Sequence, residues 1–201
     1  FPDSLIAQSP AHPRDSARLL VYDRKSAGVE LDTFKNLQKH LPPRAVIVFN
    51  ETKVIPARFF AFKPTGGKVE LLYTGKSTKT FDALANRSLN VGDVLTLFNS
   101  VRKITKARRG VNQEYKITVS KKLSKGYRFT SSFPIAQLFS ILDKFGVTPI
   151  PPYIKNNTFA EKKLRTEYQT VFAKSQGSSA APTASLHFTG ALLSKLKKIG
   201  I

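Results

Sequence analysis

Apolar and polar residues along the first third of the chain alternate as in an α/β protein. Residues 18–24 (RLLVYDR) have the apolar run of a strand, and Asp32 or Thr33 can cap a short helix after it. The apolar side of this helix would consist of Leu31, Phe34, Leu37 and Leu41. Pro42 and Pro43 end it. Residues 45–49 (AVIVF) then form a run typical of a strand buried on both faces, which places Asn50 at the end of a buried strand.

From about Ala57 the pattern changes to short β segments separated by turns such as Gly66-Gly67. The segments are 57–63 (ARFFAFK), 68–73 (KVELLY), 94–99 (VLTLFN), 101–109 (VRKITKARR), 113–122 (QEYKITVSKK) and 127–132 (YRFTSS). Strands of this number and spacing predict a small antiparallel barrel.

Helical periodicity returns after Ser132, with Pro134 near the first turn and Gly146 as the C′ residue. The apolar side of this helix would be Ile135, Leu138, Phe139, Leu142 and Phe145. A last helix, 191–200, is capped by Thr189 and turns Leu192, Leu193, Leu196 and Ile199 inward. We therefore expect a discontinuous α/β (α+β-like) domain, residues 1–56 and 149–201, with a barrel domain, residues 57–148, inserted into it.

The amino-acid composition excludes several kinds of catalytic and metal-binding site. The 201 residues, 41% of them hydrophobic, can bury one sizeable core or two small ones. The absence of cysteine excludes disulfides, thiolate zinc sites and a cysteine nucleophile, and His12, His40 and His187 have no metal-ligand spacing, so we expect no metal. No apolar run approaches the roughly 20 residues needed to span a bilayer, and the start lacks a secretory signal, so we expect a cytoplasmic protein without membrane contact.

The charge points to a polyanionic partner. There are 33 Lys and Arg against 13 Asp and Glu, a formal net charge of +20. Many of the basic residues lie between positions 101 and 128, where the only acid is Glu114. They are Arg102, Lys103, Lys106, Arg108, Arg109, Lys116, Lys121, Lys122, Lys125 and Arg128. RNA contact is one explanation; charged strand edges that prevent aggregation, or general solubilising charge, are the others.

Two segments carry polar residues beyond what packing needs. In residues 6–21 these are Gln8, Arg14, Asp15 and Arg18, close to two prolines. In residues 49–58 they are Asn50, Thr52, Lys53 and Arg58, which follow the expected buried strand, where ligand sites of α/β sheets gather. Alternatively, Asn50 and Thr52 form a turn and bond to local backbone.

A third segment, 168–189 (YQTVFAKSQGSSAAPTASLHFT), is the most informative. Its tiny residues, 177–181, would let a substrate lie close against backbone amides. A helix would bring Tyr168 and Phe172 together, to stack on a base or to pack in the core, and packing is favoured for Phe172. His187 lies between Leu186 and Phe188, so it is either a general acid or base or a structural hydrogen-bonding residue.

Five motifs, in order, resemble the S-adenosylmethionine:tRNA ribosyltransferase-isomerase family of queuosine biosynthesis, in its N-terminal portion. They are IAQxPxxxRDxxRLLV at 6–21, NxTKVIPAR at 50–58, GGKVELL at 66–72, PxPPYI at 149–154, and YQTVFA with AAPTASLHFT in 168–189. The resemblance implies an α/β domain with an inserted six-stranded antiparallel barrel. It also implies a tRNA-modifying enzyme that moves the ribosyl group of its co-substrate, S-adenosylmethionine, onto 7-aminomethyl-7-deazaguanine at the tRNA wobble position and isomerises it to give epoxyqueuosine.

The resemblance further implies partners and site residues. The partners are S-adenosylmethionine and a tRNA with a GUN-type anticodon; no metal is used, and the full-length form is a monomer. The residues that match the family motifs are Arg14, Asp15, Arg18, Asn50, Thr52, Lys53, Arg58, Tyr168, Gln169, Thr170, Pro182, Thr183, His187 and Phe188. By hypothesis, His187 and Asp15 transfer protons. Lys53, Arg14 and Arg58 would hold phosphate or the methionine carboxylate, and Ala180, Ala181, Pro182 and Thr183 would contact the nucleoside.

The sequence departs from the family pattern in three ways. Ser185 replaces the usual Gly, and Phe172 replaces a common Tyr. Family members also continue with motifs such as HVGxGTF and NFHLP that help to build the active site, and nothing follows Ile201 here. We therefore expect the C-terminal part of the family fold to be absent and the last helix to leave an apolar face uncovered, and the activity of this chain alone stays an open question. Alternatives to an enzyme are a non-catalytic RNA-binding or accessory relative, and a truncated relative without a stable role.

Overall fold

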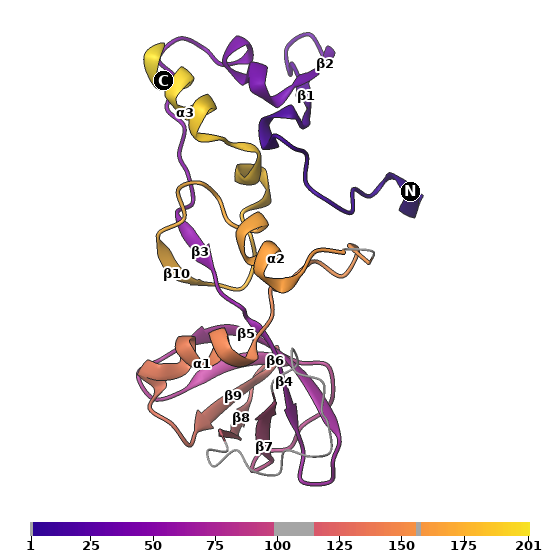
Figure 1. The fold of residues 1–201 in the computed structure, drawn as a ribbon, viewed down its shortest axis with the longest axis vertical. Helices are drawn as coiled ribbons and strands as arrows, with labels where there is room; N and C mark the ends of the chain where they lie inside the picture. The colour runs from indigo at the N-terminus through magenta and orange to yellow at the C-terminus, as the bar shows by residue number, and fades with distance from the viewer. Residues whose placement is uncertain (1, 99–114, 156–157) are drawn as a thin grey trace. The chain divides into compact units, whose positions relative to one another are not determined.

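The structure is a computed structural model that describes residues 2–98, 115–155 and 158–201 (Figure 1). It divides into two compact units. Unit 1 comprises Phe1–Lys53, Pro151–Ser175 and Ala181–Ile201, and unit 2 comprises Val54–Ile150 and Gln176–Ala180. The domain boundaries expected from the sequence, 56/57 and 148/149, stay a prediction.

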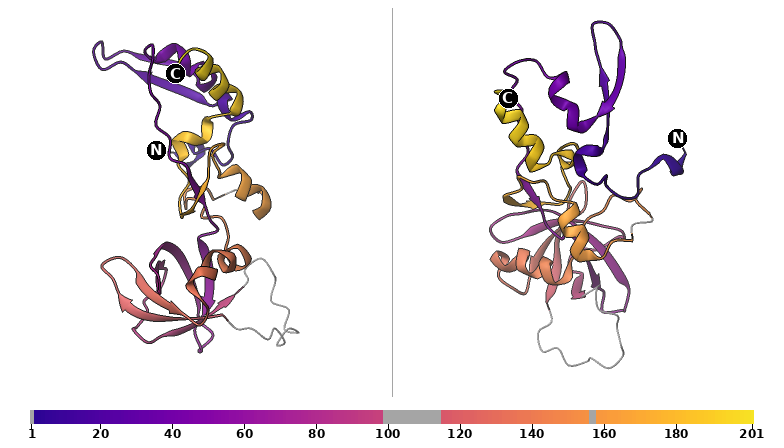
Figure 2. Two further views of the ribbon diagram at one scale, coloured as in Figure 1. Left: turned by 90° about the vertical axis from the view of Figure 1, so that its left-hand side faces the viewer. Right: turned by 45° about the horizontal axis from the view of Figure 1, so that its top comes forward.

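Unit 2 is a closed antiparallel barrel, as predicted (Figure 2). Its strands, in the order β4-β5-β6-β9-β8-β7, are β4 (Arg58–Phe62), β5 (Lys68–Lys76), β6 (Phe81–Ala85), β9 (Tyr127–Ser131), β8 (Lys116–Lys122) and β7 (Val94–Phe98). Alternate residues turn inward, as in β4, where Phe59 and Ala61 are buried and their neighbours are not. Phe81 and Phe129 lie directly opposite each other in register, and their rings stack at 5.3 Å in the barrel core.

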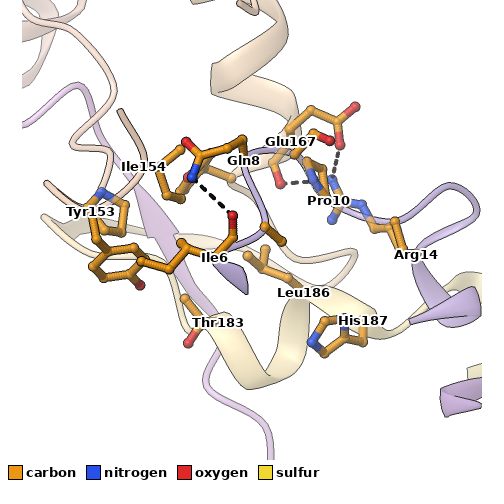
Figure 3. A pocket seen from close by; sticks show the side chains of 15 residues that line it. Ile6, Gln8, Pro10, Arg14, Tyr153, Ile154, Glu167, Thr183, Leu186 and His187 are labelled. Carbon is orange, nitrogen blue, oxygen red and sulfur yellow. Dashed lines mark hydrogen bonds and ion pairs between the residues drawn. The ribbon is translucent and has the colours of Figure 1, made fainter. Parts of the chain in front are cut away.

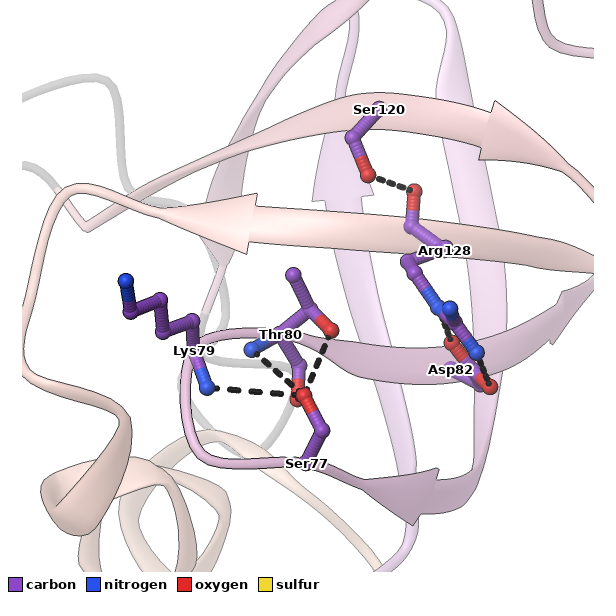
Figure 4. A network of polar contacts seen from close by, with 6 residues as sticks. All are labelled: Ser77, Lys79, Thr80, Asp82, Ser120 and Arg128. Carbon is purple, nitrogen blue, oxygen red and sulfur yellow. Dashed lines mark hydrogen bonds and ion pairs between the residues drawn. The ribbon is translucent and has the colours of Figure 1, made fainter.

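One strand of the barrel was not predicted. β6 was missed because its sequence, FDALA, is short and weakly β-forming, although it pairs with the preceding strand β5 as well as with the distant β9. The predicted strand at 101–109, with Arg102, Lys103, Lys106, Arg108 and Arg109, lies outside the described residues. Polar contacts join the outer faces of β6 and β9: Arg128 donates to Asp82 through Nε at 2.8 Å and Nη2 at 2.9 Å (Figure 4). The hydroxyl of Ser77 accepts from the backbone N–H of Thr80 in the turn before β6.

The predicted helix after Ser132 consists of the 3₁₀ turn η4 (Ile135–Gln137) and α1 (Leu138–Phe145). Leu138, Ile141 and Leu142 of this helix are buried in the barrel core. Gly146 does follow the helix, but its backbone is extended (φ −88°, ψ 164°) rather than left-handed, because its segment turns back to the barrel at once. The next residue, Val147, exchanges two hydrogen bonds with Arg58 at the start of β4.

Unit 1 contains short elements. They are η1 (Asp3–Leu5), η2 (Arg14–Ser16), β1 (Arg18–Tyr22), β2 (Val29–Thr33), η3 (Phe34–His40), α2 (Glu161–Glu167), η5 (Thr183–His187) and α3 (Gly190–Lys198). β1 and β2 form an antiparallel hairpin. The residues of β3 (Thr52–Val54) and β10 (Ser175–Ser178), which pair with each other, are divided between the two units.

A second apolar cluster forms the core of unit 1. Its buried members are Phe34, Phe188, Leu192 and Leu196. Phe188 meets Phe34 edge-on at 5.0 Å and Phe49 at 4.9 Å, and Phe49 also contacts Phe172 at 4.4 Å. Phe172 therefore packs in the core, as favoured from the sequence. Thr189 caps α3 as predicted, since its hydroxyl accepts from the N–H of Leu192.

Two local predictions in unit 1 were wrong, and one conditional arrangement does not occur. The helix expected after residue 31 is a 3₁₀ helix that begins at Phe34, without a side-chain cap, and Leu31 lies exposed in β2. Residues 168–172 are not helical, because α2 ends at Glu167. The last helix buries Leu192 and Leu196, so it is covered on that face, whereas Ile199 is exposed rather than inward.

The strand expected at 45–49 is also absent. Those residues lie in neither helix nor strand, and Val46 and Val48 are 86% and 90% exposed. A strand buried on both faces needs neighbouring strands, and among the described residues none pairs with this segment. Within the described parts of the chain, no helix combines the length and apolar character that crossing a bilayer requires.

Candidate active site

A cavity of about 360 Å³ lies within unit 1 (Figure 3). Its walls come from the N-terminal segment, the segment after Ile150, the end of α2, and η5. The residues that line it are Ile6, Ala7, Gln8, Ser9, Pro10, Ala11, Arg14, Pro151, Tyr153, Ile154, Glu167, Tyr168, Thr183, Leu186 and His187. A cavity of this volume can hold a ligand of nucleoside size.

His187 is the last residue of η5, and its position is set by packing. The helix begins after Pro182, and the buried Phe188 anchors its end in the apolar cluster. The imidazole of His187 lies 5.2 Å from the ring of Phe34. Among the described residues, no side chain or backbone group forms a hydrogen bond with the imidazole nitrogens. The ring therefore keeps both nitrogens for a ligand or water.

Arg14 joins the N-terminal segment to the end of α2. Its guanidinium donates to the carbonyls of Gln169 at 2.5 Å, Thr166 at 3.1 Å and Glu167 at 3.1 Å, and it lies 3.5 Å from the Glu167 carboxylate. The carbonyls at a helix C-terminus lack partners within the helix and carry partial negative charge, so an arginine there is stabilising. Arg14 lines the cavity, but most of its donors already have protein partners.

Tyr168 and Tyr153 supply the phenolic groups of the cavity wall. Burial of Tyr168 raises the pKa of its phenol, and repulsion from Tyr153 raises it further. The Tyr168 hydroxyl therefore stays protonated in neutral solution and can donate a hydrogen bond.

Asp15 has a structural partner outside the cavity lining. Its carboxylate accepts from the Thr189 hydroxyl at 2.9 Å, and that hydroxyl accepts from the N–H of Leu192 at 3.1 Å. Asp15 thus orients the residue that caps α3.

The residues of the 50–58 motif have different surroundings. The side-chain oxygen of Asn50 accepts from the N–H of Thr52 at 2.9 Å and from its hydroxyl at 2.5 Å, which is the turn that the sequence left open as an alternative. Lys53 is exposed in β3. Arg58 belongs to unit 2, where it donates to the carbonyl of Ile150 at 3.0 Å and lies 3.4 Å from Glu70.

The remaining predicted residues have varied surroundings. Arg18 is exposed on β1, and Gln169 accepts from Arg14 through its carbonyl. Thr170 is buried, and its hydroxyl has no partner among the described residues. Ala180 accepts from the Ser178 hydroxyl at 2.7 Å in a local turn. Ala181 and Pro182 precede η5 and are not among the lining residues.

The structure therefore brings Arg14, Tyr168, Thr183 and His187 around one cavity, although they come from distant parts of the sequence. Sequence reasoning missed Tyr153, Glu167 and Leu186. Tyr153 lies within a motif that had been recognised, PxPPYI, so a signal for it existed. Glu167 had none, because an isolated glutamate on a charged helix looks like a solvated residue.

Three possible metal ligands lie together away from the cavity. Glu30, Asp32 and His40 have ligand atoms within 4.8 Å of one another. The carboxylate of Asp32 accepts from the Asn36 amide, lies 2.9 Å from His40 Nε2 and accepts from the Thr33 N–H, and these bonds hold the pKa of Asp32 far below its usual range. The hydrogen bonds account for the arrangement without an ion, and the expectation of metal-free chemistry stays a prediction.

Comparison with known proteins gives consistent results. The family described as "Queuosine biosynthesis protein" matches residues 1–201. The S-adenosylmethionine:tRNA ribosyltransferase-isomerase of Aquifex aeolicus is 40% identical over 100% of this chain and 56% of its own length. That of Rubrobacter xylanophilus is 39% identical over 100% of this chain and 54% of its own. The chain thus spans about half the length of the curated relatives it matches.

A solved structure of an S-adenosylmethionine tRNA ribosyltransferase from Thermotoga maritima also matches. It is 23% identical, covering 99% of this chain and 52% of that chain, with a TM-score of 0.37. A TM-score this low does not establish that the two folds are alike.

Proposed function

Because this chain belongs to the queuosine biosynthesis protein family, we propose that it takes part in a tRNA ribosyltransferase-isomerase reaction with its cavity as the S-adenosylmethionine site. The reaction would transfer the ribosyl group of S-adenosylmethionine to 7-aminomethyl-7-deazaguanine at the tRNA wobble position and isomerise it, giving epoxyqueuosine. The relatives are named for this class of reaction.

One observation carries the proposal. Arg14, Tyr168, Thr183 and His187 come from two motifs more than a hundred positions apart, and all four line a cavity of about 360 Å³. A mixed lining of aromatic, apolar and hydrogen-bonding side chains suits an adenosyl group, whose base is apolar on its faces and polar at its edge.

In this proposal His187 is the proton-transfer residue. The sulfonium of S-adenosylmethionine acidifies the neighbouring carbon, so the reaction needs a base, and the departing adenine needs a proton or a hydrogen-bond donor. An imidazole can exchange protons near neutral pH, and the His187 nitrogens have no hydrogen-bond partner among the described residues. Tyr168, which keeps its proton, would donate a hydrogen bond to the ligand. Asp15 would act through Thr189, two residues after His187, rather than by touching the substrate.

An adjoining cavity suggests how S-adenosylmethionine lies. It measures about 220 Å³, shares Ile6, Gln8 and Tyr153 with the larger cavity, and is also lined by Asp3 and Lys155. The Lys155 ammonium lies 3.0 Å from the Asp3 carboxylate, a pair of opposite charges that matches the ammonium and carboxylate of the methionine end. The adenosyl group would then occupy the larger cavity.

The other details are proposed on the family resemblance. They are a tRNA with a GUN-type anticodon as partner, a monomeric full-length form, a cytoplasmic location and a reaction without metal. Lys53, Arg58, Asn50 and Thr52 would contact the tRNA or phosphate, with Arg18, Gln169, Thr170, Ala180, Ala181 and Pro182 as further substrate contacts.

The test separates binding from chemistry. We expect S-adenosylmethionine to bind the chain in calorimetric titration and Thr183→Trp, which fills the cavity, to abolish binding. The matched variant Thr65→Trp, on an exposed turn of unit 2, should bind normally. If Thr183→Trp binds S-adenosylmethionine as tightly as Thr65→Trp, the cavity is not the binding site.

The activity itself is tested by mass spectrometry after incubation with S-adenosylmethionine and tRNA that carries the aminomethyl-deazaguanine base. Free adenine together with epoxyqueuosine supports the proposed reaction. Binding of tRNA without either product supports the accessory RNA-binding alternative.

A further inference from the structure

Residues 45–49 have the sequence of a strand, but none of the strands that the structure describes pairs with them. Ile47 and Phe49 pack against the apolar cluster of unit 1, whereas Val46 and Val48, the alternate residues, turn outward and are almost fully exposed. Such alternation is typical of a strand with one covered face. Two outward valines next to each other on that face leave apolar surface in contact with water.

The backbone N–H and carbonyl groups of residues 46–49 also lack hydrogen-bond partners among the described residues. Ala45 before them and Glu51 after them have backbone partners. Free backbone groups on an extended apolar run are a template for pairing with another strand.

The β1–β2 hairpin leaves a second apolar face uncovered. In its register Leu20 is opposite Leu31 and Tyr22 is opposite Val29, so all four lie on one face, and all four are exposed. Leu19, on the other face, packs against the same cluster as Ile47 and Phe49. An isolated two-stranded hairpin is marginally stable in water, so this ribbon depends on what packs against it.

We propose that residues 46–49 and the outer face of the β1–β2 hairpin are covered by polypeptide from the part of the family protein that this chain does not match, with one strand of it paired to residues 46–49. The Aquifex and Rubrobacter relatives contain such polypeptide, since the chain accounts for 56% and 54% of their lengths. RNA does not suit this surface, because its exposed valines, leucines and Tyr22 are uncharged and Arg18 is the one cation on the outer face of the hairpin. The inference rests on family membership and not on the proposed chemistry.

The chain has no cysteine, so an introduced thiol reports its own exposure. Val48→Cys and Leu31→Cys probe the two uncovered surfaces. Val91→Cys is the matched control, an exposed valine in unit 2. Each variant is first labelled with a maleimide in the 201-residue chain. It is then labelled in two extended proteins, in which the unmatched segment of the Aquifex or of the Rubrobacter relative is fused to Ile201.

We expect the thiols at positions 48 and 31 to react as fast as that at position 91 in the 201-residue chain. With either segment joined, labelling at 48 and 31 should slow by about tenfold or more while labelling at 91 is unchanged. Unchanged labelling at 48 and 31 with both segments would overturn the proposal. Labelling that slows with rising concentration of the 201-residue chain would also overturn it, because a second copy would then be the cover.

Discussion

His187 is positioned by the ring of Phe34 and by the buried Phe188 after it, without a hydrogen bond to its nitrogens among the described residues. His187→Phe should keep the ring contact and the stability of unit 1. Turnover should fall by about 100-fold to 10,000-fold if the imidazole transfers a proton. His12→Phe is the control, since His12 is exposed and does not line the cavity. A His187→Phe protein with the parent rate of adenine release would exclude the role.

Gly146 is required by a close approach of backbone. A Cβ at this position would lie 2.0 Å from the carbonyl oxygen of Pro56 and 2.7 Å from that of Leu142, and neither can move freely. We expect Gly146→Ala to lower the free energy of unfolding by at least about 2 kcal/mol, measured by urea denaturation. Gly67→Ala has only the Thr65 hydroxyl at 3.9 Å nearby and should unfold like the parent within about 1 kcal/mol.

At the scale of elements, the Asp82–Arg128 pair joins β6 to β9. Hydrogen bonding from Arg128 is the main reason that the Asp82 pKa lies below its ordinary value of 3.8, and burial opposes it. The folded state thus binds this proton less readily than the unfolded state. The stabilisation is complete above pH 3.8 and is lost as the pH falls through the lower pKa of the folded state.

Asp82→Asn should therefore destabilise the barrel at neutral pH, by no more than about 1 kcal/mol for a partly exposed pair. The difference in the free energy of unfolding between variant and parent should shrink as the pH falls below about 4. Urea denaturation at several pH values measures this difference. Asp32 and Asp93 also have lowered pKa values, so part of the acid sensitivity should remain in the variant. A difference that is constant with pH would contradict the assignment.

The start of α3 depends on a relay from Asp15 through Thr189 to the N–H of Leu192. Thr189→Ala should cost about 1 kcal/mol of stability, as for other N-caps. Ser194→Ala, in the same helix and exposed, is the control. Asp15→Asn keeps an acceptor for the Thr189 hydroxyl, so it should melt like the parent. Its turnover should then fall only if Asp15 itself transfers a proton.

Barrel strands with a clear alternation of apolar and polar residues could be predicted from the sequence, because neighbouring strands show the same alternation. In the barrel, inward residues such as Phe59, Val69 and Ile117 alternate along each strand, and the strands pair with each other. The run at 45–49 was predicted as a strand from the same kind of signal, but whether it becomes one depends on a partner that the described residues lack. Sequence motifs identified Arg14 and His187, whereas the contacts of Arg14 with α2 depend on packing over long separations.

At the scale of the whole molecule, the charge of +20 predicts strongly salt-dependent RNA binding. Each phosphate contact should lower log affinity by roughly 0.7 to 0.9 per unit of log salt concentration. We expect tRNA affinity, measured by fluorescence anisotropy, to fall by more than about tenfold between low and physiological salt. An unrelated RNA of equal length should show a similar slope. Affinity that barely changes with salt would mean that the basic residues are solubilising charge.

The hydrogen bonds between Arg58 and Val147 hold the two ends of the segment 58–147, which contains all six barrel strands, side by side. For the rest of the chain, the barrel is thus a long loop whose ends are already closed. The entropy cost of closing a loop grows only with the logarithm of its length, and here the inserted unit provides the closure itself. The chain before Arg58 and after Val147 therefore needs to bridge only a short gap.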